Sequence, residues 1–202
     1  NEEERESFLM GMFNLASQLA PRIATEIDLN ERSRLLDLAG GPGTYAIHFC
    51  QKNPSLTAVI YDLPTTRSFA EQTVRRFALS DRIAFVAGDI INDEIDSGFD
   101  VVWISHLLHS EGPKACAAIL AKAAKALNDG GRLLIQEFIL DDNKIAPLHP
   151  ALFSLNMLIG TPSGKAYTQG ELFQLVRDAG LRKVNRLPIK LPNGAGIISA
   201  IR

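Results

Sequence analysis

The most informative part of the chain is the stretch Leu35-Leu36-Asp37-Leu38-Ala39-Gly40-Gly41-Pro42-Gly43-Thr44, followed downstream by Tyr61-Asp62-Leu63-Pro64. Its apolar start is typical of a buried parallel strand. The three glycines then allow a tight backbone turn with no side chain in the way of a ligand. A helix over 44–52 and a second strand over 57–61 follow. This order of strand, turn, helix and strand predicts a nucleotide-shaped binding site.

Asp62 stands at the tip of the second predicted strand. A carboxylate about 20 residues beyond the first glycines of such a unit can accept two hydrogen bonds from ribose hydroxyls. The glycines alone do not choose the ligand, because Gly41-x-Gly43-x-x-Ala46 also satisfies the G-x-G-x-x-A dinucleotide fingerprint. An NAD-dependent oxidoreductase therefore stays an alternative at this point.

Asp37 favours a cationic ligand over NAD. A carboxylate at the end of the first strand would repel a pyrophosphate seated on helix N–H groups. S-adenosylmethionine (SAM) carries an ammonium and a sulfonium and no phosphate, so acid at both strand tips favours SAM. The alternative is that Asp37 is a turn or helix-capping carboxylate.

The composition predicts one globular domain without a nucleic-acid or membrane partner. The 202 residues are 46% hydrophobic, and 21 basic against 23 acidic side chains give a formal charge of −2. The acidic start Glu2–Glu6 and the lack of an apolar run of about 20 residues predict a cytoplasmic location. Cys50 and Cys116 lie in apolar helical patterns without metal-ligand spacing, so we expect buried reduced thiols and no metal site.

The rest of the chain alternates between strand and helix patterns. Strands are expected over 34–38, 57–61, 83–86, 99–104 and 132–138, and helices over 44–52, 65–78, 113–127 and 168–179. Asn128–Gly131 reads as a helix stop before a strand, and Thr168-x-x-Glu171 as a capping box. The apolar runs 184–187 and 195–201 are close enough to require an antiparallel hairpin. The fold class is therefore α/β, with a Rossmann-like doubly wound, mostly parallel sheet.

Together these segments resemble the class I SAM-dependent methyltransferases, in particular the catalytic domain of the caffeate and bacterial small-molecule O-methyltransferases. The segments that carry the resemblance, in order, are Leu36–Gly43, Ile60–Pro64, Val86–Ile90, Leu107–His109 with Leu120, Gly130–Glu137, Gly164–Thr168 and Asp178–Leu181. The resemblance implies a seven-stranded sheet with an antiparallel last strand. It also implies that 31–202 is the catalytic domain and that the helical segment 1–30 follows an absent dimerisation domain, so that the full-length protein is a homodimer.

The resemblance also implies a set of SAM-binding residues. The turn Gly40–Gly43 would hold the methionine portion, Asp62 the ribose hydroxyls, and Asp89 with Ile90 the adenine. The full set of implied cofactor positions is Met12, Asp37, Gly40, Gly41, Gly43, Asp62, Leu63, Gly88, Asp89, Ile90 and Ser105. Besides Asp37, two of these have a second interpretation, because Asp89 could be a turn residue and Met12 a core residue of the first helix.

His109 is the general base that the resemblance implies, and Glu137 would orient its imidazole. Histidine ordinarily titrates near neutral pH and can accept a proton from a phenol or enol. His106 is a rival, because it lies three residues earlier and both side chains could face the cleft if a helical turn begins there. Spacing to the next helix favours His109. Glu137 could instead be a solvated or salt-bridged residue at a strand end.

The acceptor side departs from the family pattern. Ser110 and Glu111 stand where an acidic residue and a tryptophan commonly follow the histidine, and Ala166 stands where a further glutamate frames the base. Phe153, Asn156, Met157 and Thr161 fall where relatives line the acceptor pocket, although helical packing would also explain them. The leading hypothesis is methyl transfer to a hydroxyl of a small, aromatic metabolite. The alternatives are carbon or nitrogen methylation, or a SAM-binding domain that has lost catalysis and serves assembly or regulation.

Overall fold

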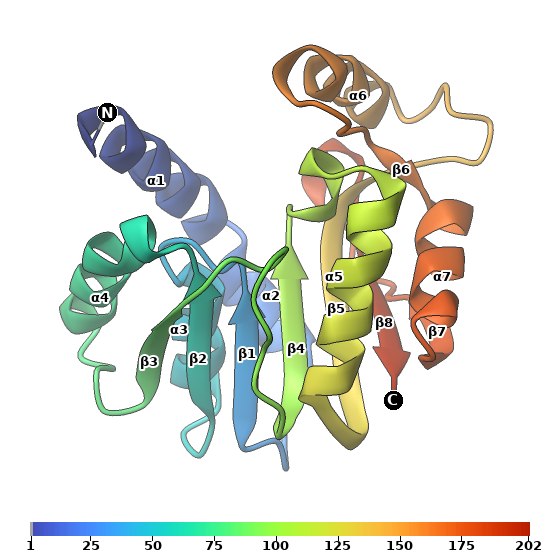
Figure 1. Ribbon diagram of the computed structural model, residues 1–202. Coiled ribbons are helices and arrows are strands. Elements are labelled where there is room, and N and C mark those ends of the chain that lie inside the picture. The colour runs from blue at the N-terminus through green and yellow to red at the C-terminus, as the bar shows by residue number, and fades with distance from the viewer. Residues whose placement is uncertain (1) are drawn as a thin grey trace. The chain divides into compact units, whose positions relative to one another are not determined.

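The computed structural model describes residues 2–202, which form two compact units. The first unit comprises the chain up to Asp93 together with Phe99–Val101, and the second comprises Glu94–Gly98 together with Val102–Arg202. In both units strands alternate with helices along the chain, as the colours of Figure 1 show. This alternation confirms the predicted α/β class.

The first unit contains a parallel sheet. Its elements in chain order are α1 (Glu2–Ser17), α2 (Ala20–Glu26), β1 (Arg34–Leu38), α3 (Thr44–Lys52), β2 (Thr57–Asp62), the 3-10 turn η1 (Pro64–Thr66), α4 (Arg67–Arg76) and β3 (Ile83–Ala87). β1 pairs in parallel with β2, and β2 with β3. Leu38 lies opposite Tyr61, and Asp62 lies opposite Ala87. The three strands therefore end at the same edge, where a ligand can meet all of them.

Both ends of β1 are fixed by hydrogen bonds. The side chains of 35–38 are buried, and the N–H of Ala39 donates to a carbonyl of β2 at 2.8 Å. At the other end, the Asp100 carboxylate accepts the N–H groups of Ser33 and Arg34 at 2.8 and 3.1 Å. The turn that follows β1 therefore starts from a defined position.

The second unit ends in antiparallel strands. β4 (Phe99–Ser105) begins in the first unit and ends in the second, and is followed by η2 (Leu108–Ser110), α5 (Pro113–Ala126), β5 (Leu127–Leu140), α6 (Leu148–Gly160), β6 (Tyr167–Thr168), α7 (Gln169–Asp178), β7 (Arg182–Arg186), η3 (Pro192–Gly194) and β8 (Ala195–Ile201). β8 pairs antiparallel with both β5 and β7, and β6 pairs in parallel with β5. The predicted C-terminal hairpin is confirmed.

Most predicted boundaries agree with the structure, and two do not. β1, α3 and β8 span the predicted residues. The helix expected over 65–78 is the turn η1 followed by the shorter α4. The helix before Asn128–Gly131 ends as expected, at Ala126, but the strand expected from residue 132 already begins at Leu127 and continues through a left-handed Gly130 with φ of +74°. A glycine can adopt that conformation within a strand, so the turn signal did not delay the start of β5.

The N-terminal segment packs against the core through residues further along the chain than predicted. The pattern over 8–20 predicts one amphipathic helix that covers the core, but Phe8 and Leu15 on α1 are 62% and 60% exposed. Pro21 lies in the first turn of the separate helix α2, where its missing N–H costs nothing. Ile23 of α2 is fully buried, whereas Leu9 is the buried residue of α1. The segment therefore contributes to the core more through α2 than through α1.

Helix α6 is not among the predicted elements. Leu152, Leu155 and Leu158 on this helix are 57%, 57% and 70% exposed. Apolar residues thus occur around the helix rather than on one side, so no amphipathic period marks it in the sequence.

The remaining predictions about the chain concern thiols and membrane spans. Cys50 and Cys116 are free and buried, as expected, and burial raises the pKa of both thiols to about 11. Within residues 2–202, no helix combines the length and apolar character needed to cross a bilayer.

The start of α7 provides a test of local folding. The Thr168 side chain accepts the N–H of Glu171 at 3.1 Å, and the Glu171 carboxylate accepts the N–H of Thr168 at 2.9 Å. We expect Thr168→Ala to lower the free energy of unfolding by about 1 kcal/mol, because a capping acceptor is lost. Urea unfolding measures the change. Thr168→Ser keeps the hydroxyl and should retain most of the stability, so equal losses in both variants would contradict the capping interpretation.

Candidate functional site

The turn between β1 and α3 brings the backbone close to the strand ends of the first unit. Gly41 and Gly43 have φ angles of +53° and +75°, which glycine adopts without strain. A Cβ on Gly43 would collide with the side chain of Ile60, and a Cβ on Gly40 would lie 2.6 Å from Cγ of Asp37. The close approach of the turn to β1 and β2 therefore requires glycine at these positions.

Asp62 links this turn to the end of β2. Its Oδ2 accepts the N–H of Gly41 at 2.7 Å, and its Oδ1 accepts the N–H of Leu63 at 2.7 Å and the hydroxyl of Thr66 at 3.2 Å. These three donors fix the orientation of a half-buried carboxylate. Each carboxylate oxygen can accept more than one hydrogen bond, so Asp62 retains capacity to accept ligand hydroxyls.

Asp37 is a buried acid at the end of β1. Only 1% of its surface is exposed, and it accepts the N–H of Ala46 at 3.2 Å. Desolvation raises its pKa to about 7, the Asp62 charge adds to that rise, and the Ala46 hydrogen bond opposes it. A cation bound beside this carboxylate would stabilise its ionised form. The hydrogen bond to the first turn of α3 also fits the predicted alternative of a helix-capping carboxylate.

Gly88 and Asp89 follow β3. The N–H of Gly88 donates to the Asp62 carbonyl at 2.9 Å, which places this segment beside the end of β2. The Asp89 carboxylate accepts the N–H of Ile91 and the side-chain amide of Asn92, both at 2.8 Å. These local bonds match the turn-residue alternative, so an adenine contact by Asp89 stays a prediction.

Four further predicted cofactor residues lie at different places. Leu63 is 50% exposed after β2, and Ile90 is half-buried after β3. Met12 is 37% exposed on α1, which argues against its alternative role as a core residue. Ser105 is the last residue of β4. The structure therefore brings the glycine turn, Asp62 and Gly88 together, and the roles of these four stay predictions.

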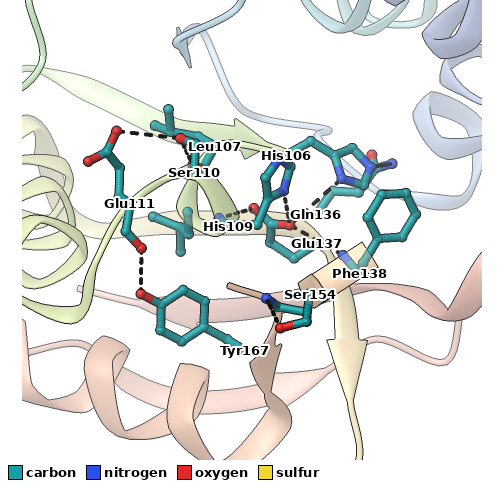
Figure 2. A network of polar contacts seen from close by, with 12 residues as sticks. His106, Leu107, His109, Ser110, Glu111, Gln136, Glu137, Phe138, Ser154 and Tyr167 are labelled. Carbon is teal, nitrogen blue, oxygen red and sulfur yellow. Dashed lines mark hydrogen bonds and ion pairs between the residues drawn. The ribbon is translucent and has the colours of Figure 1, made fainter. Parts of the chain in front are cut away.

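In the second unit, His109 and Glu137 form a close pair (Figure 2). His109 belongs to the 3-10 turn η2 and Glu137 lies near the C-terminal end of β5. His109 Nδ1 lies 2.8 Å from Glu137 Oε2, and the backbone N–H of His109 donates to Oε1 at 3.3 Å. A carboxylate partner assigns the ring proton to Nδ1 and leaves Nε2 with a lone pair.

Glu137 is ionised despite being only 1% exposed. Burial raises its pKa, but the neighbouring imidazoles of His106 and His109 outweigh burial and hold that pKa below its usual value. The N–H of Phe138 also donates to Oε2, at 3.3 Å. The solvated form of the alternative is therefore wrong, and Glu137 is a buried carboxylate that contacts the His109 ring at 2.8 Å with the His106 ring further away.

His106 lies near the same carboxylate but is held differently. Its Nδ1 is 3.7 Å from Glu137 Oε2, beyond a hydrogen bond. Its backbone N–H donates to the Gln136 carbonyl at 2.9 Å, and its Nε2 lies 3.2 Å from Gln136 Nε2. His106 also has a φ of +53°, an unfavourable conformation for a residue with a Cβ. Strain of this kind persists where the surrounding structure fixes the residue, often at functional sites.

Aromatic rings surround the two imidazoles. The Phe138 ring lies 4.5 Å from the His106 ring, and Phe153 of α6 lies 4.8 Å from His109 in an edge-to-face contact. Phe138 and Phe153 are themselves 4.8 Å apart. Phe153 is thus brought to the predicted base, whereas Phe138, together with Gln136, was missed. A strand alternates its side chains between two faces, and an apolar β5 gave no signal for which face would meet a histidine.

The other predicted acceptor residues are placed less distinctly. Asn156 is exposed and Met157 half-buried on α6. The Thr161 hydroxyl donates to the Met157 carbonyl at 2.8 Å and accepts the N–H of Gly164 at 2.7 Å. Thr161 thus closes the end of α6, which favours the alternative of helical packing for this residue. Substrate contacts by these three residues stay predictions.

The backbone supports the turn that carries His109. The N–H of Lys165 donates to the His109 carbonyl at 2.9 Å, and Cys116 Sγ lies 3.3 Å from the Leu108 carbonyl. Ala166, at the position of the missing glutamate, is buried, and its N–H donates to Ser154 Oγ at 3.1 Å. The turn that carries His109 is therefore held by the backbone bond from Lys165 rather than by a second carboxylate.

The comparisons with known proteins identify the family of the chain. Residues 1–182 match the family described as an O-methyltransferase domain. The chain is 34% identical over 197 residues to 3-hydroxy-5-methyl-1-naphthoate 3-O-methyltransferase from Streptomyces sahachiroi, a match that covers 98% of this chain and 57% of that protein. It is 36% identical over 140 residues to L-tyrosine C(3)-methyltransferase from Streptomyces lavendulae, which covers 69% of this chain and 38% of that protein.

A solved structure gives the same result for the fold. The structure of human N-acetylserotonin methyltransferase in complex with SAM superposes with a TM-score of 0.87 at 26% identity, and covers 100% of this chain and 56% of that one. The predicted Rossmann-like sheet with antiparallel C-terminal strands is confirmed. The chain spans a little over half the length of the first of these relatives.

The buried Asp37 predicts a specific dependence of stability on pH. An unfolded aspartate ionises near pH 4, whereas Asp37 in the folded chain keeps its proton up to about pH 7. Its contribution is therefore fully present below pH 4 and is lost as the pH rises through 7. We expect Asp37→Asn to be more stable than the parent at pH 8, by on the order of 1–4 kcal/mol, and close to it at pH 4.

Urea unfolding at several pH values measures this difference. Asp81→Asn is the matched control, because Asp81 is exposed and its replacement should leave the pH profile of the parent unchanged. Parallel profiles for Asp37→Asn and the parent would show that Asp37 does not retain a proton in the folded state.

Proposed function

The chain belongs to the O-methyltransferase domain family, and from this we propose that it binds SAM and transfers the methyl group to a hydroxyl of a small aromatic metabolite. The observation that carries the proposal is the 2.8 Å contact between His109 Nδ1 and the buried carboxylate of Glu137. That contact presents a neutral imidazole with a lone pair on Nε2, which is the chemistry of a general base. This chain spans only part of the length of its relatives, so the activity of the full-length protein is also part of the proposal.

SAM fits the acids of the first unit better than a dinucleotide does. Asp62 is oriented by three donors and can accept ribose hydroxyls, a role common to both ligands. Asp37 distinguishes them, since a buried carboxylate beside the first turn of α3 favours an ammonium and disfavours a pyrophosphate. The glycine turn brings the backbone close enough for the methionine portion of SAM.

Methyl transfer from SAM needs little chemistry from the protein beyond alignment and proton removal. The acceptor oxygen attacks the methyl carbon as the carbon–sulfur bond breaks, and the bonding electrons pass to sulfur to give S-adenosylhomocysteine. The hydroxyl proton passes to Nε2 of His109. Glu137 then stabilises the imidazolium through the Nδ1–H bond, as a carboxylate does in other histidine-based sites.

His109 is a better candidate for the base than His106. The contact of His109 Nδ1 with Glu137 is 0.9 Å shorter than that of His106 Nδ1, at 2.8 against 3.7 Å. The His106 Nε2 that would accept a proton already faces the Gln136 amide. His106 therefore has neither a tautomer fixed by a carboxylate nor an Nε2 that is open to the acceptor hydroxyl.

The side chains around His109 indicate which kind of methyl acceptor the protein would bind. Phe138 and Phe153 border the His109 ring and suit a flat aromatic substrate. One relative is named a carbon methyltransferase, so transfer to an activated ring carbon is the second candidate. The loss of catalysis is less favoured, because the base and its buried carboxylate are both in place.

The domain division and the homodimer stay predictions. The exposed apolar residues Phe8 and Leu15 of α1 agree with a segment that is covered by further protein in the full-length chain. Sedimentation of the full-length protein would determine its oligomeric state.

The base assignment predicts a selective loss of turnover. We expect His109→Gln to lower kcat by about 10²–10⁴-fold, because glutamine keeps the size of the side chain but accepts no proton. Formation of S-adenosylhomocysteine against a panel of phenols, catechols and hydroxynaphthoates measures turnover in the full-length protein. SAM affinity should change by only a few fold. His48→Gln is the control, since His48 lies on α3 outside this cluster.

Turnover that survived in a folded His109→Gln protein would exclude His109 as the base. Persistent absence of turnover in the parent, together with tight SAM binding, would favour the non-catalytic alternative.

The cofactor assignment predicts the ligand preference of the first unit. In calorimetric titrations the full-length protein should bind SAM and give no heat with NAD. Asp62→Asn should lower the affinity for SAM by about 10- to 100-fold, because each hydrogen bond to a charged acceptor contributes about 1.5–3 kcal/mol. Asp81→Asn, which changes an exposed carboxylate, should bind SAM like the parent. Binding of NAD in preference to SAM would refute the assignment.

A further inference from the structure

Three side-chain atoms of the kinds that bind metal ions lie close together in the second unit, around the proposed general base. A side-chain nitrogen from each of His106 and His109 and a carboxylate oxygen of Glu137 all lie within 4.8 Å of one another. Figure 2 shows both imidazoles directed at the same carboxylate. Glu137 needs only one of them to orient a base. The second imidazole therefore has no function in the proton transfer described above.

His106 Nδ1 is the atom that this arrangement leaves unexplained. It is buried and has no hydrogen-bond partner among residues 2–202. Buried polar atoms without a partner are uncommon and indicate an interaction that the protein atoms alone do not supply. The atom lies 3.7 Å from the Glu137 carboxylate, which is too far for a hydrogen bond and close enough to share a third partner.

We propose that His106, His109 and Glu137 form a binding site for a divalent transition-metal ion of the zinc class. Zinc binds histidine nitrogen and carboxylate oxygen at about 2.0–2.2 Å, so two ligand atoms on one ion lie about 3–4 Å apart. Of the contacts to Glu137 Oε2, the one of 3.7 Å lies within that range and the one of 2.8 Å lies just below it. Two imidazoles and one carboxylate favour zinc, nickel or cobalt over magnesium or calcium, which prefer oxygen ligands.

The surroundings of His106 suit a metal ligand. Its ring packs on Phe138 at 4.5 Å, and its Nε2 faces the Gln136 side-chain amide at 3.2 Å. With the amide in its alternative orientation, Gln136 Oε1 accepts the Nε2–H of His106, and Nδ1 then presents a lone pair to the ion. A hydrogen bond on the opposite ring nitrogen is the usual support of a metal-binding histidine. The left-handed backbone of His106, with φ of +53°, keeps the ring in this position.

An ion at this site would inhibit methyl transfer. The ion binds His109 at Nδ1, so the single ring proton of the neutral imidazole moves from Nδ1 to Nε2. That nitrogen no longer has a lone pair for the acceptor hydroxyl. This consequence rests on the proposed function of His109, whereas the metal site itself does not.

The site is tested by titrating ZnCl₂ into the full-length, untagged, metal-free protein by calorimetry, with no SAM or acceptor present. We expect saturable binding of one zinc ion per chain and no binding of Mg²⁺. His106→Asn should lower the zinc affinity by roughly 10- to 100-fold or more, because the loss of a residue that merely supports a metal ligand already costs that much. Asparagine tolerates positive φ, so this variant keeps the backbone. Glu137→Gln removes a second ligand independently.

His149→Gln is the matched control for zinc affinity. The His149 ring lies 4.7 Å from Phe138, in the same neighbourhood, but it is not among the three converging side chains. Its replacement should leave zinc affinity unchanged. No saturable zinc binding in the parent, or equal affinity in the parent, His106→Asn and Glu137→Gln, would overturn the proposal.

The turnover assay separates this inference from the proposed function. Zinc that binds with the expected variant pattern and blocks turnover supports both. Zinc that binds in that pattern without slowing turnover supports the metal site and overturns the assignment of His109 as the base.

Discussion

The second unit depends on one buried negative charge. Burying an ionised carboxylate without partners is expensive, so Glu137 must be compensated by every donor that reaches it. The donors are the His109 ring and the backbone N–H groups of His109 and Phe138, with the His106 ring nearby. The contacts of His109 constrain the turn after β4. The tautomer of His109 is therefore a consequence of how the charge on β5 is stabilised, and any change to Glu137 would alter the base as well as the fold around it.

The two buried acids show how surroundings set the state of the same functional group. Desolvation raises the pKa of both Asp37 and Glu137. Glu137 has two imidazoles to offset that effect, and its pKa falls below the usual value. Asp37 has one backbone N–H at 3.2 Å and a neighbouring carboxylate, so its pKa is raised to about 7. The chain thus keeps a carboxylate that lacks a cationic partner at the end of β1, which is stabilised best when a cationic ligand supplies that partner.

Local sequence patterns predicted those features of the fold that depend on residues close together in the sequence. The glycine turn, the strand β1 and the capped start of α7 follow from the conformational freedom of glycine, apolar runs and hydroxyl caps, and each agrees with the structure. The choice between His106 and His109 depended on Glu137, 28 residues beyond His109, so spacing alone left it open. Phe138, Gln136 and α6 were missed for the same reason, because their positions depend on pairing and packing across the second unit rather than on a periodic signal.

The departures from the family pattern can be understood from how the base turn is supported. A second carboxylate near His109 would compete with Glu137 for the same ring proton and would add another buried charge to compensate. The family resemblance puts Ala166 at that position, and a backbone bond from Lys165 to the His109 carbonyl holds the turn, while Ala166 bonds to Ser154 of α6. Neutral hydrogen bonds can orient a turn without changing its charge. One carboxylate is then sufficient to orient His109, and the identity of the acceptor depends on the aromatic side chains around the base rather than on further acids.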